Sequence, residues 1–422
     1  MTNRVSQPVF TREMKQTHTI LFPNMLDIHF RFLENILNAS GYHAMRLMNE
    51  GASICELGLQ YVHNDTCYPA LLTIGQMLDA LLNGMADPDH SALIMPQTGG
   101  GCRASNYVFL LRKALDAAGY QQVPVISLNI SGLDSQPGFD LNLPLLRKML
   151  AAMAYGDLLM ALSNQTSPYE THKGQTEELV AAWINELSQH FNEGHGYDLK
   201  TMKRNAAKIA QSFHQIPVNC IPKIKCGIVG EIYVKYSALA NNHLEDFLKN
   251  NDCEVMVPGI MQFLLYAADM PIEDARRYGG RKSSQLMSIA MFEFLQKYES
   301  LMLDAVAQYS EFTVPASYKE LKELGAEMIS TGCKMGEGWL LSAEMAELAS
   351  KGYDNIICVQ PFGCLPNHII GKAMMGRIQK KYPNANVTAI DYDPGSAKVN
   401  QENRLRLLLS IAQESLQDQF ES

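Results

Sequence analysis

Ala92-Leu-Ile-Met95 leads through Pro96-Gln-Thr-Gly-Gly-Gly-Cys102 into a segment from Arg103 to Ala118 that has the pattern of a helix. Four apolar residues bounded by turn residues are typical of a short buried strand. Val123-Pro-Val-Ile-Ser-Leu128 follows and has the pattern of the next strand. Strands that alternate with helices along a chain predict a parallel sheet covered by helices.

The same alternation extends to both sides of this segment. His18 to Phe22 and Tyr42 to Leu47 have strand patterns, and Ile28 to Leu37 between them is amphipathic. Beyond a helical region from Leu143 to about Ile216, strands are expected at 223–230, 254–257, 355–359 and 386–391. We therefore expect an α/β fold of two Rossmann-like parallel-sheet lobes, joined and decorated by helices.

This pattern divides the chain into three regions. The first α/β lobe is expected over residues 1–142, with loops that carry Cys67 and Cys102. Residues 143–219 are expected to form a helical connecting region. The second α/β lobe is expected over 220–422, with a helical insertion at about 260–350 and a loop that carries Cys364.

The composition excludes several classes of protein. The chain has 422 residues, of which 47% are hydrophobic and 19% charged, so we expect neither a disordered nor a collagen-like protein. Its formal net charge of −9 offers no general basic field, so nucleic acid is not expected as a partner.

Met1 to Gln16 lacks the apolar core of a signal peptide. The longest apolar run, Leu143 to Leu162, contains three charged residues, so we expect no membrane span and a cytoplasmic protein.

Three of the nine cysteines share one setting. Cys67, Cys102 and Cys364 each lie in a loop between an expected strand and a helix, next to glycine or proline. Such loops gather at the carboxyl edge of a parallel sheet, where ligands usually bind. The helix that follows should lower the pKa of each thiol, and Gly99, Gly100 and Gly101 should let the backbone approach a ligand closely.

A set of soft thiolates of this kind suits an iron–sulfur cluster. Two other interpretations stay open at this point, namely small buried loop residues and a zinc site. The chain contains no Cys-x-x-Cys pair, which disfavours a zinc ribbon. The other six cysteines are interpreted mainly as packing residues. Cys333 follows Gly332 and is a possible fourth ligand, although a surface or packing thiol is favoured.

Two further sets of residues are candidates for chemistry. Glu231 directly follows an expected strand, where it either acts as an acid or base or caps the next turn. Basic residues surround Gly279 and Gly280 and either hold phosphates or form a solvated helix junction, which we favour. These basic residues are Arg276, Arg277, Arg281 and Lys282.

Motifs along most of the chain resemble those of the 2-hydroxyacyl-CoA dehydratase family. The sequence is most similar to the C-terminal module of large proteins in which this module is fused to an acyl-CoA dehydratase activase. The motifs are Tyr61-Val-His-Asn-Asp-Thr-Cys-Tyr-Pro69, Gln97-Thr-Gly-Gly-Gly-Cys-Arg-Ala-Ser-Asn-Tyr107, Val229-Gly-Glu-Ile-Tyr-Val-Lys235, Gly336-Glu-Gly-Trp339, Val359-Gln-Pro-Phe-Gly-Cys-Leu-Pro-Asn-His368 and Ala389-Ile-Asp-Tyr-Asp-Pro-Gly395.

The resemblance implies a [4Fe-4S] cluster that Cys67, Cys102 and Cys364 hold between the lobes. It implies radical dehydration or reduction of an acyl-CoA or a similar small molecule, with an electron from an ATP-dependent activator. Because the chain shows no actin-like ATPase phosphate loop, the activator (activase) is expected to be a separate protein. A homo- or heterodimer is expected. The alternatives are a non-catalytic electron-transfer subunit and a zinc-stabilised structural protein.

Overall fold

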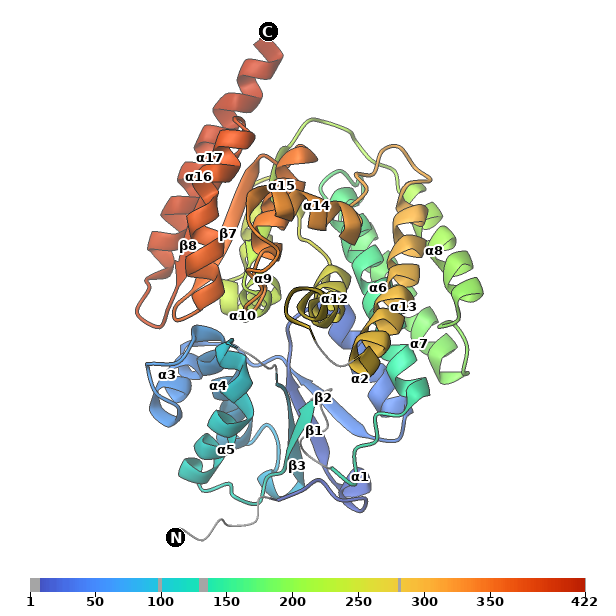
Figure 1. The fold of residues 1–422 in the computed structure, drawn as a ribbon, viewed down its shortest axis with the longest axis vertical. Helices are drawn as coiled ribbons and strands as arrows, with labels where there is room; N and C mark the ends of the chain where they lie inside the picture. The colour runs from blue at the N-terminus through green and yellow to red at the C-terminus, as the bar shows by residue number, and fades with distance from the viewer. Residues whose placement is uncertain (1–7, 98–100, 129–135, 280–281, 422) are drawn as a thin grey trace.

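The computed structural model describes residues 8–97, 101–128, 136–279 and 282–421 and confirms the α/β fold (Figure 1). Two four-stranded sheets are present, and every strand pair within them is parallel. The first sheet has the order β2-β1-β3-β4 and the second the order β6-β5-β7-β8. The strands are β1 Thr19–Pro23, β2 His43–Leu47, β3 Ser91–Pro96, β4 Val125–Leu128, β5 Ile224–Gly230, β6 Cys253–Met256, β7 Asn355–Pro361 and β8 Asn386–Tyr392.

Both sheets reverse their winding direction in the middle. The chain begins the first sheet at β1, adds β2 on one side and then crosses to β3 on the other side. The second sheet repeats this course with β5, β6 and β7. Loops that leave neighbouring strands in opposite directions open a crevice at the carboxyl edge. The loops after β3, β5 and β7 carry Cys102, Glu231 and Cys364 respectively, so each of them starts at such a crevice.

Helices cover the first sheet and connect it to the second. Pro69 lies in the first turn of α4, where its missing N–H is harmless, and Asn142 caps α6 by accepting a hydrogen bond from Leu145 N at 3.0 Å. The helices of this part are α1 Met14–Thr17, α2 Asp27–Ala39, α3 Ala52–Tyr61, α4 Tyr68–Leu82, α5 Tyr107–Ala118, α6 Leu143–Thr166, α7 Gln175–Asn192 and α8 Leu199–His214, with 3₁₀ turns η1 Pro88–His90 and η2 Arg103–Asn106.

The remaining helices belong to the second half of the chain. The helix expected from Arg103 to Ala118 begins later than the pattern indicated, because Arg103–Asn106 is a 3₁₀ turn. These helices are α9 Ile232–Tyr236, α10 Ala238–Asn241, α11 Leu244–Asn250, α12 Ile260–Tyr278, α13 Lys282–Val306, α14 Tyr318–Met328, α15 Leu340–Ser350, the π-helix η3 Asn367–Lys372, α16 Ala373–Lys381 and α17 Lys398–Glu421.

One large apolar core joins the helical region to the helices expected as an insertion. Phe213 of α8, Tyr155 of α6 and Tyr298 of α13 are buried in it, and α13 runs beside α6 and α8 (Figure 1). Burial of aromatic side chains in one continuous core holds these helices as a single layer beside the two sheets. Among the described residues, no helix has the length and apolar character needed to cross a membrane.

Candidate functional site

The loops of Cys67 and Cys364 are in direct contact although they come from opposite lobes. The expectation that the Cys67 loop follows a strand is wrong, because residues 52–61 form α3 and the loop joins α3 to α4. Cys67 is the N-terminal cap residue of α4, and the next backbone N–H, of Tyr68, donates to Phe362 O at 2.9 Å. Gly363 has a φ of +74°, and a Cβ built on it would lie 3.1 Å from Cys67 Cα. Glycine is required here because the chain turns left-handed and another backbone packs against it.

The Cys102 loop also contacts the Cys67 loop. Cys102 caps η2, and the next residue, Arg103, donates from Nη1 to Asp65 O at 2.7 Å. Tyr107, at the start of α5, has its Oη 2.8 Å from Cys67 Sγ. The structure therefore brings the loops of all three predicted ligands together at the carboxyl edges of the two sheets.

Residues 335–337 fill the space between the Cys102 and Cys364 loops. A Cβ on Gly101 would lie 2.8 Å from Met335 Sδ, and one on Gly336 would lie 2.7 Å from Pro366 Cγ. Gly101 packs against Met335, whereas Gly99 and Gly100 lie outside the described residues. After burial, the negative charge of Glu337 also raises the pKa of Cys102 and Cys364.

Glu231 caps α9, as one of its two interpretations anticipated. Its Oε2 accepts a hydrogen bond from Val234 N at 2.9 Å, while Glu337 Oε1 accepts from Ile232 N at 2.9 Å. Both carboxyl groups are more than nine-tenths buried. Sequence reasoning quoted Glu337 only as part of a motif, and no local pattern could show that it accepts from the same helix as Glu231.

The thiol pKa values run against the expectation from the helix N-termini. Burial raises the pKa of Cys67 and Cys364, and it raises that of Cys102 to about 11. The hydrogen bond from Tyr107 and the backbone N–H of Ala70 act in the opposite direction on Cys67, but they do not overcome desolvation. The thiols of the metal-free chain are therefore protonated near neutral pH, and a bound cation has to displace their protons.

The other cysteines differ in exposure and surroundings. Cys226, Cys253 and Cys358 are buried in strands, Cys55 and Cys333 are half-buried, and Cys220 is exposed. Cys333 lies in a closed turn, in which its N–H donates to Ser330 O at 2.9 Å and its carbonyl accepts from Trp339 N at 2.7 Å.

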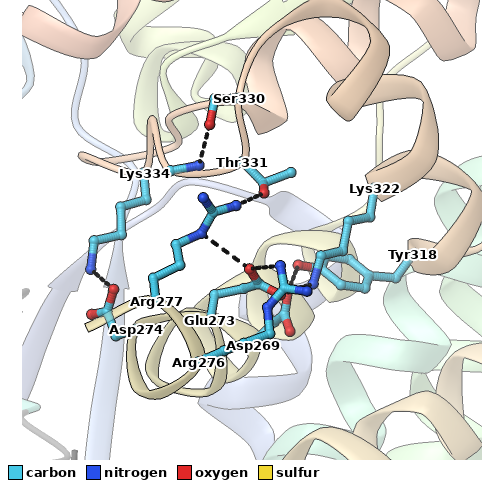
Figure 2. A network of polar contacts seen from close by, with 11 residues as sticks. Asp269, Glu273, Asp274, Arg276, Arg277, Tyr318, Lys322, Ser330, Thr331 and Lys334 are labelled. Atoms are coloured by element: carbon cyan, nitrogen blue, oxygen red, sulfur yellow. Dashed lines mark hydrogen bonds and ion pairs between the residues drawn. The ribbon is translucent and has the colours of Figure 1, made fainter. Parts of the chain in front are cut away.

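A network of charged side chains fixes the Cys333 turn on α12 (Figure 2). Arg277 donates to Thr331 Oγ1 at 2.5 Å, and Lys334 pairs with Asp274. Arg276 and Arg277 both pair with Glu273, at 2.7 and 3.3 Å. Both arginines thus pair with a carboxylate near the end of α12, in agreement with the favoured interpretation of a solvated helix junction. Arg281 lies outside the described residues.

Three thiols from three loops are soft donors of the kind that an iron–sulfur cluster or a zinc ion takes. No group of three His, Cys, Asp or Glu side chains within the described ranges is arranged around one metal position. Asn367 also donates to Cys364 Sγ at 3.2 Å, and its buried Oδ1 has no partner among the described residues. Hydrogen bonds to sulfur of this kind are typical of cluster ligands.

Comparison with known proteins adds no assignment. The chain matches no protein-family model, and no curated protein matches its sequence.

Proposed function

We propose that this chain is an iron–sulfur component of the 2-hydroxyacyl-CoA dehydratase type. It would use a low-potential [4Fe-4S] cluster for radical dehydration or reduction of an acyl-CoA or a similar small molecule. A separate ATP-dependent activator would supply the electron. The proposal joins the motif resemblance to one observation, the contact between the Cys67 and Cys364 loops through the Tyr68 N to Phe362 O hydrogen bond.

The residues of the proposed site would have different roles. Cys67, Cys102 and Cys364 would hold the cluster, which supplies a reversible one-electron couple when it is bound. With three thiolates as its protein ligands, the cluster would supply a position at which a substrate oxygen could bind. Asn367 would donate to the Cys364 sulfur and so stabilise its negative charge. Glu231, which accepts from Val234 N at the start of α9, would hold a proton.

Removal of single thiols tests the ligand assignment. After anaerobic reconstitution with iron and sulfide, we expect Cys67→Ala, Cys102→Ala and Cys364→Ala each to lose most of the bound iron. Cys55→Ala and Cys358→Ala are matched controls, because one thiol is half-buried and the other lies in the strand that precedes Cys364. Iron and sulfide analysis with electron paramagnetic resonance gives the readout. Full iron content in all three variants would show that the ligand assignment is wrong.

Two further measurements separate the alternatives. Cys333→Ala reports whether a fourth thiol contributes, since only a ligand should change the cluster spectrum. The reduced protein is then offered a panel of acyl-CoA esters with and without a 2-hydroxyl group. Turnover supports the enzyme, whereas electron exchange without turnover supports an electron-transfer subunit. Zinc at one equivalent without sulfide would support the structural alternative.

A further inference from the structure

A cavity of about 370 Å³ lies between the two lobes. Residues that follow β1 and β2 line it from the first lobe, and residues of α10 and α11 line it from the second. None of the described residues that line it belongs to the three cysteine loops. Small-molecule sites are usual at lobe interfaces and at the carboxyl edge of a parallel sheet, and this volume is within their ordinary range.

The buried part of the lining contains an amide group that is free to bind. Leu26, Leu47 and Met160 supply apolar surface there. Asn164 of α6 lines the same cavity and is 4% exposed, and its side-chain amide makes no hydrogen bond within the described part of the chain. Since a buried amide without a partner is costly, Asn164 offers a donor and an acceptor to a polar group that enters the cavity.

Gln76 adds a second unused acceptor to this lining. Its Nε2 donates to Asn49 O at 2.9 Å and to Leu47 O at 3.4 Å, which fixes the orientation of the amide. Its buried Oε1 accepts no hydrogen bond among the described residues. The uncompensated carbonyl dipole favours a hydrogen-bond donor in the cavity over an acceptor or an anion.

The half-exposed part of the lining is acidic. His243 Nε2 lies 3.0 Å from Glu50 Oε2 of the first lobe, and its Nδ1 lies 3.3 Å from Asp246 Oδ2. Because one imidazolium carries a single charge, it cannot neutralise both carboxylates. The other two lining carboxylates pair with basic residues, Glu245 with Lys249 and Asp27 with Arg46. Negative charge therefore remains at this end of the cavity.

We propose that this cavity binds a small organic cation, an aliphatic amine that carries a neutral hydroxyl or amide group at its far end. The ammonium would lie beside Glu50 and Asp246, since it has three donors and no acceptor. The aliphatic chain would pack on the apolar side chains, and the neutral group would bond to the amide of Asn164. A second ammonium does not suit the inner end, where a charge would be desolvated without a counter-ion. The acidic end repels phosphates, so this site goes beyond the proposed acyl-CoA reaction.

Calorimetric titration of the purified chain at low ionic strength tests the site with 4-amino-1-butanol. We expect one molecule to bind per chain, and 1,4-butanediol, which lacks the charge, not to bind. Glu50→Gln should weaken binding of the amino alcohol about threefold. Glu193→Gln is the matched control, because Glu193 forms a similarly exposed pair with His195 at 3.0 Å outside the cavity. It should leave the affinity unchanged.

Asn164→Leu tests the inner end of the site. It should weaken binding of 4-amino-1-butanol about fivefold and leave binding of n-butylamine, which has no hydroxyl, unchanged. Equal weakening of both ligands would show a packing effect and overturn the role of Asn164.

Three other outcomes would overturn the site itself. These are tighter binding of the anion 4-hydroxybutyrate, displacement of the amino alcohol by Mg²⁺ at equal concentration, and absence of binding heat for both amines at two temperatures. The first and third need no variant, so they stay decisive if a variant fails to fold. Because no predicted thiol ligand lines the cavity, such a failure is distinct from failure of the proposed function, which iron analysis reports.

Discussion

Two clusters of buried carboxyl groups differ in charge balance. We call the first, at the start of α9, the pocket-wall group; it consists of Glu231, Glu337, Glu344 and Lys235. The second is the α12 network, formed by Asp269, Glu273, Arg276, Arg277 and Lys322. In the α12 network, Glu273 pairs with Lys322, Arg276 and Arg277, and Asp269 accepts from Lys322 and from Tyr318. Burial opposes ionisation, but these contacts together lower the pKa of Glu273. In the pocket-wall group a single ammonium faces three carboxyl groups, and the pKa of each carboxyl group is raised.

This contrast separates a structural cluster from one suited to chemistry. The α12 network holds the Cys333 turn in place with its charges satisfied (Figure 2). In the pocket-wall group, burial raises the pKa of all three carboxyl groups, and Glu231 follows β5 at the carboxyl edge of its sheet, where ligands usually bind. The two clusters differ in the number of cations and in their exposure, since Lys235 is buried whereas Arg276 is exposed.

The largest expected effect comes from removing the one cation of the pocket-wall group. Lys235→Met leaves Glu344 buried without its partner, and we expect a loss of about 3–5 kcal/mol in the free energy of unfolding. The loss should grow with rising pH, because Glu344 can escape the penalty only by binding a proton. Urea unfolding at pH 6 and pH 8 measures this change.

Lys322→Met is the matched control for that substitution. Glu273 keeps Arg276 and Arg277, and Asp269 keeps the hydroxyl of Tyr318, so we expect a loss of only about 1 kcal/mol. Equal losses in the two variants would contradict the proposed difference in charge balance.

An intermediate effect is expected in the pH dependence of stability. The pKa of Glu337 is raised on folding, so its contribution is fully present below its unfolded pKa of about 4.5 and is lost as the pH rises through the folded value. The pKa of Glu273 is lowered, so its contribution is present above about 4.5 and is lost as the pH falls. Glu337→Gln should therefore stabilise the protein at pH 8 relative to pH 5, by about 1.4 kcal/mol for each unit of pKa shift removed.

Glu273→Gln should change the same profile with the opposite sign. It removes stability at pH 8, and this difference shrinks only as the pH falls below about 4.5 towards the lowered pKa of the folded state. Chemical denaturation of both variants between pH 4 and pH 8 gives the comparison. Parallel profiles for the two variants would show that both clusters are ionised alike.

The smallest effect is expected at the periphery of the α12 network. Arg277→Met removes the hydrogen bond to Thr331 but leaves Arg276 and Lys322 on Glu273. We expect less than about 1 kcal/mol in global stability and faster alkylation of Cys333, because the turn that carries it loses one anchor. Alkylation of Cys55 is the internal control. An unchanged Cys333 rate would show that the other anchors suffice.

Much of the fold could be predicted because its signals are local. Apolar runs followed by glycine or proline marked β3, β5 and β7 within a few residues, and the alternation with helices indicated parallel sheets. The start of α5 was expected too early, at Arg103, because no local pattern indicated that Arg103–Asn106 forms a 3₁₀ turn. The loops of Cys102 and Cys364 were readable because their signals are local, since each follows its own strand, whereas Cys67 lies between α3 and α4 and not after a strand as expected.

The sequence by itself determined the two α/β halves and the residue types available at the ends of their strands. Only the tertiary structure decided that the Cys67 and Cys364 loops touch, that Glu337 and Glu231 both accept from backbone N–H groups of α9, and that Lys235 pairs with Glu344. It also reversed the expected shift of the thiol pKa values, because desolvation outweighs the nearby N–H groups. Periodicity depends on neighbours along the chain, whereas charge balance and desolvation depend on neighbours in space, and the latter exist only once the two lobes have come together.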